Sequence, residues 1–465
     1  MAMMKGFSNA FRIPELRKKI LITLGLVFVC RLVSQIPTPG VDWRALQQVI
    51  ETAKQTSAGG GLLDWFDVFT GGALGQCAIG FLSIWPYISA QIVIQLLGSV
   101  IPSLEKLKKE GETGRQQLAQ ITRYLTIVLC VVQSWGIATM LSHPGALGQA
   151  FAGVEIVVNP GLGFQLMTVI GMTSAALFVM WLADQITTFG IGNGASLIIM
   201  INITSRLPQA IISAWERYFG LAGVQASAPI AELPIVILFF LLVVAGTVML
   251  TQGVRKVAIH TTRRSVGGGN TYGMQQTFMP LRVNYTGVMP IIFAQPLIQI
   301  PAALLMKVTD PTSSGLSGTL NRFAQDLSNP TVTHLVVYAI LIMFFAFFWV
   351  ATQFNAIDIS ENLKKDGSYI PGIRPGRATA EFLDDMMTKI TLIGGTGLLV
   401  VALIPMILMG WMSIPWAIAS FFGGTSLLII VGVALDTLRI MVSHLLVRKY
   451  EGFLSHGSLK GRGGM

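Results

Sequence analysis

The sequence predicts an all-α integral membrane protein with ten transmembrane helices, and three observations support this fold class. Of its 465 residues, 52% are apolar and only 12% are charged, whereas about a quarter of the residues in a typical soluble domain are charged. The charges cluster between apolar runs of about 20 residues, and at ~1.5 Å per residue such a run can cross a ~30 Å hydrocarbon core. Lys and Arg also gather in alternate loops, as expected from the excess of basic residues in the cytosolic loops of membrane proteins.

Ten apolar segments are candidates for the spanning helices, and they are residues 20–36, 77–100, 121–141, 164–186, 195–213, 233–251, 286–306, 333–353, 389–409 and 416–438. The first run could pass for a signal peptide, but it continues to Gln35 without a small-residue cleavage site. We therefore interpret it as a retained first helix.

The basic residues predict the orientation. With the N-terminus in the cytosol, five segments each place five Lys or Arg on the cytosolic side, namely 1–19, 101–123, 252–285, 354–389 and 436–465. The opposite orientation would place these residues outside, against the positive-inside bias. Membrane topology therefore explains the net charge of +10 better than nucleic-acid binding does. An even number of spans permits two inverted five-helix halves, 1–230 and 231–465, with a polar path between them.

The segment from Leu62 to Leu74 is too short to cross a membrane and ends in two glycines. Asp64 and Asp67 lie three residues apart, on one face of a short amphipathic helix. Such a helix can lie in the membrane interface. It can also re-enter the membrane depth, provided that protein or a watery cavity surrounds its backbone.

Motifs for catalysis, cofactors and metals are missing from the sequence. It contains no HExxH, GxSxG or GxxxxGK[ST] pattern, and its three cysteines lie in apolar runs without metal-ligand spacing, so we interpret them as packing residues. The stretch GIGNGAS at 190–196 is interpreted as a tight turn between two helices, with a phosphate-binding loop as the weaker alternative. We therefore expect no enzymatic activity, no cofactor and no metal.

Charged residues near the apolar runs are few. Arg31, Asp184, Asp436 and Arg439 are expected near helix ends, where they can reach the interface. An ion-coupled transporter usually keeps a charged relay at mid-depth, and the sequence shows none.

Several longer segments carry a resemblance to a known family. In chain order they are LLDWFDVFTGGALGQCAIGFLSIWPYISAQIVIQLL, KKEGETGRQQLAQITRY, FGIGNGASLIIMINI, LRVNYTGVMPIIFAQ, ENLKKDGSYIPGIRPGRATAEFLDDMMTKITLIG and FFGGTSLLIIVGVALD. Together they resemble the SecY/Sec61-alpha family, the channel subunits of protein translocases. The resemblance weakens in the predicted outer loops 143–163, 214–232 and 308–332, and in the stretch SVGGGNTYG.

The resemblance implies a central pore between spans 1–5 and 6–10, with a lateral opening between spans 2 and 3 and spans 7 and 8. It also implies that the half-helix is a plug, which replaces the interfacial interpretation. The plug residues are Leu62, Leu63, Asp64, Trp65, Phe66, Asp67, Val68, Phe69, Thr70, Gly71 and Gly72.

The resemblance also places a pore ring at five isoleucines, Ile84, Ile88, Ile199, Ile292 and Ile429. A narrow apolar ring can surround a passing chain, and it resists ions by dewetting when it is empty. The route above and below the ring must be watery, because an unsatisfied backbone group in hydrocarbon costs several kcal/mol.

Polar residues on the second, third and seventh spans could border the lateral gate, and they are Gln91, Gln95, Gln133, Gln295 and Gln299. Hydrogen bonds between membrane helices are worth only about 0.6 kcal/mol each, which suits a gate that must part. Facing an aqueous cavity is the alternative role for these side chains.

Two long cytosolic loops carry candidate docking residues, which are Arg255, Lys256, Arg263, Arg264, Lys364, Lys365, Arg374 and Arg377. By resemblance these loops receive the ribosome or the SecA ATPase, and Arg374 matches the arginine most tied to that role. The alternative is that the residues only fix topology. Further implied partners are SecE-like and SecG-like membrane subunits, signal peptides, nascent chains and the lipid bilayer.

The expected function is a passive protein-conducting channel of the cytoplasmic (inner) membrane, with both termini in the cytosol. It would translocate unfolded polypeptides and release apolar segments laterally into the bilayer. A secondary transporter of small solutes is the alternative, and an intramembrane enzyme ranks third.

Overall fold

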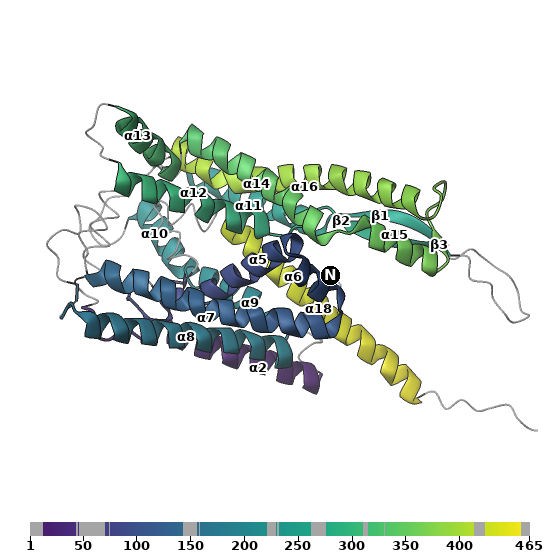
Figure 1. The fold of residues 1–465 in the computed structure, drawn as a ribbon, viewed down its shortest axis with the longest axis horizontal. Coiled ribbons are helices and arrows are strands. Elements are labelled where there is room, and N and C mark those ends of the chain that lie inside the picture. The colour runs from purple at the N-terminus through teal and green to yellow at the C-terminus, as the bar shows by residue number, and fades with distance from the viewer. Residues whose placement is uncertain are drawn as a thin grey trace, which may run out of the picture. The chain divides into compact units, whose positions relative to one another are not determined.

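The computed structural model describes residues 13–42, 45, 70–73, 75–142, 156–157, 159–220, 229, 232–261, 276–309, 315–329, 331–412 and 424–456. These residues are mostly helical and form two compact units (Figure 1). The boundary between the units crosses helix α18 after Gly432. The division into halves at residue 230 stays a prediction.

The first unit is built around helix α8. Its elements are α2 (Pro14–Val33), η1 (Ile79–Leu82), α5 (Trp85–Val100), α6 (Pro102–Lys109), α7 (Glu112–Ser142), α8 (Leu162–Phe189), α9 (Gly194–Thr204) and the later part of α18 (Gly424–His456). Helix α8 packs against α7 and α2, which lie on either side of it in Figure 1, and against α9. Their core includes Cys30, Val179, Leu182 and Ile186.

The second unit is built around helix α14. Its helices are α10 (Leu207–Phe219), α11 (Glu232–Gln252), α12 (Met289–Val308), α13 (Leu316–Ser328), α14 (Val332–Gln353), α15 (Ala356–Lys365), α16 (Arg377–Met412) and the first turns of α18. Helix α14 packs against both α12 and α16 (Figure 1). Tyr338 and Ile342 on α14 are fully buried in this core.

A three-stranded antiparallel sheet, which the all-α prediction missed, joins the two long loops of the second unit. Its strands are β1 (Val254–Thr261), β2 (Gln276–Arg282) and β3 (Ser368–Tyr369), in the spatial order β2-β1-β3. Val254 lies opposite Arg282 on β2, and Thr261 lies opposite Ser368 on β3. The sheet packs one face onto a core that includes Val257.

Nine helical stretches among the described residues are long and apolar enough to cross a membrane, and each overlaps a predicted span. The tenth predicted span, 20–36, falls in α2, which has 20 residues but carries basic residues at both ends. The count of ten is therefore not confirmed. The structure and its apolar helices are those of a multi-pass membrane protein.

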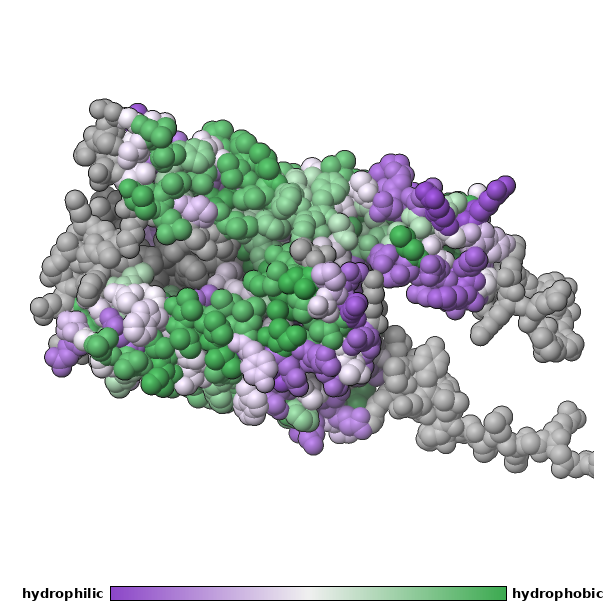
Figure 2. All heavy atoms as spheres, viewed as in Figure 1, coloured by the Kyte–Doolittle hydropathy of each residue, from purple (hydrophilic) through white to green (hydrophobic). Residues whose placement is uncertain are grey.

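Apolar side chains cover the outer faces of several helices (Figure 2). On α7, Val128 and Val132 are 57% and 63% exposed, and on α14, Ile340 is 63% exposed. Faces this apolar are explained by contact with lipid. Hydrophilic residues instead gather over α15 and the start of α16 in the second unit, and where α6 and α7 begin in the first (Figure 2).

Two smaller predictions are confirmed. The stretch 190–196 is a tight turn, since α8 ends at Phe189 and α9 begins at Gly194. The Asn193 side chain caps α9 by accepting a hydrogen bond from the backbone N–H of Ser196 at 3.2 Å. The three cysteines are free and buried, as expected of packing residues.

Helices also occur where loops were expected. Helix α13 lies in the predicted outer loop 308–332, and α10 continues into the predicted loop 214–232. Both are short and strongly amphipathic, so a search for long apolar runs does not find them.

Candidate functional site

Ile84 and Ile88 lie where the second predicted span is broken. The 3-10 helix η1 ends at Leu82, and Ser83 adopts a left-handed φ of 46° before Ile84 caps α5. The backbone N–H of Ile88 donates to the carbonyl of Ile84 at 3.1 Å. The two side chains are 2% and 6% exposed. The break therefore places both isoleucines at the start of a new helix.

Ile199 on α9 packs against the same hydrophobic cluster as Ile84 and Ile88. The first unit therefore brings three of the five predicted ring positions together. In the second unit, Ile292 on α12 and Ile429 on α18 are 5% and 2% exposed. A ring that contains all five isoleucines stays a prediction.

The predicted plug lies mostly outside the described residues, which include only Thr70, Gly71 and Gly72 of it. Thr70 is 3% exposed. Gly71 and Gly72 have φ angles of 68° and 94°, where L side chains are strained. A Cβ at Gly71 would also clash with Nη1 of Arg31. Glycine is therefore required at this position by both conformation and space.

Arg31 makes the contacts that fix this glycine. Its Nη2 donates to the carbonyl of Gly71 at 3.1 Å, and its Nη1 donates to Oδ1 of Asn202 on α9 at 3.2 Å. Nδ2 of Asn202 in turn donates to the Ser83 hydroxyl at 3.0 Å. Arg31 lies in the last turn of α2, as expected of a residue near a helix end, and its guanidinium binds polar groups inside the first unit.

Neither Arg31 nor Asn202 was predicted to belong to a functional site. A signal was present, since an arginine inside an apolar helix is expensive and is usually retained for function. Its partner lies 171 residues away, and no pattern in the sequence indicates that pairing.

The five glutamines predicted at the lateral gate lie on three helices. Gln91 and Gln95 are on α5, which packs against α7, the helix that carries Gln133. Gln91 is exposed, whereas Gln95 and Gln133 are half-buried. Gln295 and Gln299, one turn apart on α12, are 6% and 4% exposed. Their role in a gate stays a prediction.

Two of these glutamines have an unsatisfied group. Oε1 of Gln133 and Oε1 of Gln295 are buried and accept no hydrogen bond from the part of the chain that the structure describes. A buried acceptor without a partner costs about 1–3 kcal/mol. Both oxygens are therefore suited to bind water or a polar group from another molecule or segment.

The predicted docking residues that the structure describes are all exposed, and they are Arg255, Lys256, Lys364, Lys365, Arg374 and Arg377. Arg263 and Arg264 lie outside the described residues. Because β1 pairs with both β2 and β3, the sheet joins the two docking loops in one framework. We call this framework, β1 to β3 with α15 and residues 370–376, the docking platform.

The loop that carries Arg374 has a defined backbone. Gly372 and Gly376 have φ angles of 80° and 104°, and the Thr379 hydroxyl donates to the carbonyl of Arg374 at 2.9 Å. Nε of Arg377 donates to Oε1 of Glu381 at 2.9 Å. Arg374 is thus presented to solvent from a fixed turn.

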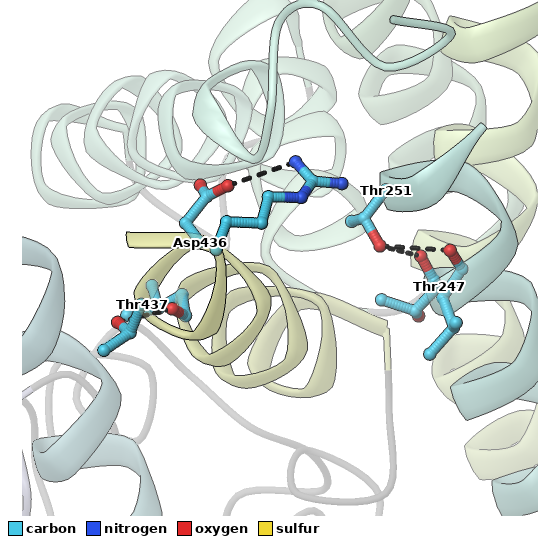
Figure 3. A network of polar contacts seen from close by, with 7 residues as sticks. Thr247, Thr251, Asp436 and Thr437 are labelled. Carbon is cyan, nitrogen blue, oxygen red and sulfur yellow. Dashed lines mark hydrogen bonds and ion pairs between the residues drawn. The ribbon is translucent and has the colours of Figure 1, made fainter. Parts of the chain in front are cut away.

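Other charged residues of the spans pair with each other. Arg123 on α7 and Asp184 on α8 are 2.7 Å apart. On α18, Asp436 pairs with Arg439 at 3.4 Å (Figure 3). Asp436 and Arg439 were expected near a helix end, but α18 continues to His456.

Hydroxyl groups of the spans bond to helix carbonyls. On α18 the Thr437 hydroxyl donates to the carbonyl of Val433 at 2.8 Å. On α11 the Thr251 hydroxyl donates to the carbonyl of Thr247 at 2.8 Å (Figure 3). Within the described residues, no group of three or more His, Cys, Asp or Glu could hold a metal ion.

Comparisons with known proteins agree on one family. The SecY family model matches residues 78–438. The chain is 41% identical over 453 residues to the protein translocase subunit SecY of Streptomyces scabiei, covering 97% of this chain and 100% of the relative. It is 38% identical to the protein translocase subunit SecY of Escherichia coli K12, covering 97% and 96% of the two chains. These relatives do not favour a small-solute transporter.

Solved structures show the same fold. A structure described as a protein conducting channel superposes with a TM-score of 0.60 at 18% identity, covering 94% of this chain and 96% of the other. Sec61 in a canine ribosome-channel complex from the endoplasmic reticulum superposes with a TM-score of 0.56 at 16% identity, with the same coverage. Taken with the full-length sequence matches, this shows that the chain belongs to the SecY family.

Proposed function

We propose that this chain is a protein-conducting channel of the cytoplasmic membrane. It translocates unfolded polypeptides and releases apolar segments sideways into the bilayer. The observation that carries the proposal is the 38% identity with a protein translocase subunit over 97% of the chain. Proteins this similar over their full length share a fold. The alignment also leaves little room for insertions that could change the activity.

The isoleucines provide the chemistry of conduction. Ile84, Ile88 and Ile199 of the first unit and Ile292 and Ile429 of the second form the narrow part of the route in this proposal. Four of them are at most 6% exposed, so each is positioned by packing. Isoleucine has no polar atom to hold water, and a ring of such side chains dewets when the channel is empty. An extended polypeptide displaces no bound water there.

The glutamines provide a lateral gate. Buried acceptors on Gln133 and Gln295 can exchange hydrogen bonds between a closed and an open arrangement at low cost, because each bond is weak in a membrane. When an apolar signal segment separates the gate helices, only weak contacts between these helices are lost. The segment itself gains contacts with lipid. The gate therefore needs no catalytic group.

Energy for transport comes from a partner at the docking platform. The five segments richest in basic residues, including both chain ends, face the cytosol in this proposal, as the positive-inside bias requires. The exposed Arg374 and the lysine pair on α15 can bind phosphates of ribosomal RNA or carboxylates of the SecA ATPase. SecE-like and SecG-like membrane subunits complete the assembly.

A trapped intermediate tests the proposal. A secretory precursor with a tightly folded C-terminal domain is stalled halfway, and a photo-crosslinking residue replaces Ile84, Ile199 or Ile429, or the control Ile340, which is 63% exposed on α14. We expect the three ring positions to crosslink to the precursor and Ile340 to crosslink to lipid. Lack of precursor crosslinks at all three ring positions contradicts the proposal.

A further inference from the structure

Arg31 connects three segments of the first unit that are far apart in the sequence. It donates to the carbonyl of Gly71 at 3.1 Å and to Oδ1 of Asn202 at 3.2 Å. Arginine can only donate hydrogen bonds, so the amide oxygen of Asn202 must face it. The amide nitrogen is thereby directed to the Ser83 hydroxyl, at 3.0 Å.

The atoms around this contact are buried and closely fitted. Asn202 is 1% exposed and Ser83 is 3% exposed. The Ser205 hydroxyl donates to the carbonyl of Asn202 at 2.7 Å, and a Cβ on Gly71 would lie 2.9 Å from that hydroxyl oxygen. This arrangement of the backbone segments is favoured because the buried groups of Asn202 and Ser83 have little access to water that could replace a lost partner.

Each end of the network has a place in the proposed channel. Gly71 lies at the end of the segment that matches the plug. Ser83 is the left-handed residue, with a φ of 46°, that directly precedes Ile84 and the helix carrying Ile88. A single asparagine therefore joins the end of the plug segment, through Arg31, to the turn that aims two of the ring isoleucines.

We propose that Arg31 and Asn202 form a clasp that holds the end of the plug segment at Gly71 and fixes it to the pore helix at Ser83. This inference rests on the proposed channel function. The two residues are positioning residues: they do not touch a passing chain, and they keep the plug segment docked in the empty channel. Breaking the clasp removes the contact of Gly71 with α2 and its link through Arg31 to Asn202, and leaves only the longer hydrogen bond from the Ser205 hydroxyl to the Gly71 carbonyl, at 3.4 Å.

The clasp predicts different effects for different substitutions. Arg31→Met keeps the length of the side chain and removes both donors. Asn202→Leu keeps the size and removes both links. Asn202→Asp keeps an acceptor for Arg31, and its second oxygen can accept from the Ser83 hydroxyl in place of donating to it, so it preserves both links. Arg217→Met on α10 is the control, because Arg217 is a largely buried arginine that pairs with Glu232 at 3.6 Å.

Thiol labelling in the full-length channel reports the state of the plug segment. Thr70→Cys is introduced after Cys30→Ala, Cys77→Ala and Cys130→Ala, and the protein is labelled in its membrane with a small maleimide. Thr70 is 3% exposed, so we expect slow labelling in the parent. Arg31→Met and Asn202→Leu should raise the rate about tenfold, as loss of a charge-assisted hydrogen bond allows. Asn202→Asp and Arg217→Met should stay near the parent.

Ion conductance in planar bilayers is measured on the same proteins, and it should rise in Arg31→Met and Asn202→Leu only. Equal labelling rates in the parent, Arg31→Met and Asn202→Leu overturn the clasp. So does an equal rise in Arg217→Met, which would indicate general loss of stability. Failure of the channel function itself can be told apart from failure of the clasp. In that case stalled precursors would crosslink to no ring position, even if thiol labelling of Thr70→Cys gave the expected pattern.

Discussion

His260 on β1 lies directly opposite Tyr369 on β3, and the centroids of their rings are 5.9 Å apart. This pair joins the loop after α11 to the loop after α15. Two surfaces that the sequence presents as separate docking loops therefore belong to one sheet. A partner that binds Arg255 on β1 and Lys365 on α15 would meet one connected framework, because β1 pairs with β3 and α15 packs against β3.

The pairing predicts a disulfide. Partners in an antiparallel ladder have Cα atoms about 4.5–5.5 Å apart, which is within the range for a disulfide. We expect His260→Cys combined with Tyr369→Cys to crosslink under mild oxidation, as seen by altered mobility after proteolysis between the loops. His260→Cys with Ser368→Cys is the control, because neighbouring residues on β3 point to opposite faces. Equal crosslinking in both pairs would contradict the register.

Charge reversal at Arg374 should impair partner-driven export. Its side chain is exposed on a turn with a fixed backbone, so Arg374→Glu changes the charge without removing a packing contact. Facing like charges across an interface costs enough to weaken partner binding by tenfold or more (~1.4 kcal/mol per tenfold). Export is measured in membrane vesicles and insertion of the channel by its abundance there.

Arg282→Glu is the matched control, since Arg282 is an exposed arginine on β2 of the same platform. We expect Arg282→Glu to retain most of the export activity. Normal export by Arg374→Glu would remove Arg374 from the docking role and leave its charge as a topology determinant.

The spans could be predicted because their cause is local. Runs such as 233–251 contain no charge, and lipid requires that length of apolar helix. The turn at 190–196 could be predicted for an equally local reason, which is its glycines. These glycines also fit closely in the structure, since a Cβ at Gly194 would meet the carbonyl of Ala183. The helix ends were less accurate. Helix α16 begins at Arg377, well before its apolar part, because backbone hydrogen bonds continue where hydropathy changes.

The sheet and the clasp could not be predicted because both depend on distant partners. Strand β1 buries only Val257 and Ile259 as an alternating pair, too short a pattern to stand out in a basic loop. Arg31 was visible as a charge in an apolar run, but nothing near it in the sequence indicates Asn202. The ring isoleucines came from family resemblance alone, since isoleucine is ordinary in any membrane helix.

Salt should weaken ribosome binding at the docking platform. If Lys364 and Lys365 bind phosphates, log affinity falls linearly with log salt, and each lost contact lowers the slope by roughly 0.7–0.9. We expect Lys364→Ala with Lys365→Ala to reduce the slope measured by cosedimentation between low and moderate salt. Lys389→Ala is the control, since Lys389 pairs with Asp385 at 2.7 Å. An unchanged slope in the double variant would contradict phosphate binding.

A polar substitution in the ring should make the empty channel leak. Ile292 and Ile298 lie on the same helix and are 5% and 1% exposed. Replacing either with serine removes packing, at about 2–5 kcal/mol for such large-to-small changes. Only Ile292→Ser should also wet the constriction and raise ion conductance across a planar bilayer. If Ile298→Ser leaks as much, the conductance reports instability and not the ring.

The lateral gate can be tested by joining its two proposed sides. We propose that Gln95 on α5 and Gln295 on α12 border the same seam when the channel is closed. Gln95→Cys with Gln295→Cys should then form a disulfide in the resting channel, with Cys30, Cys77 and Cys130 replaced by alanine, and the crosslink should block release of apolar segments into lipid. Gln95→Cys with Leu304→Cys is the control, because Leu304 is 60% exposed on α12 and lies more than two turns beyond Gln295. No crosslink in the resting state of the first pair would place Gln295 away from the gate, and its buried acceptor would then serve an aqueous cavity.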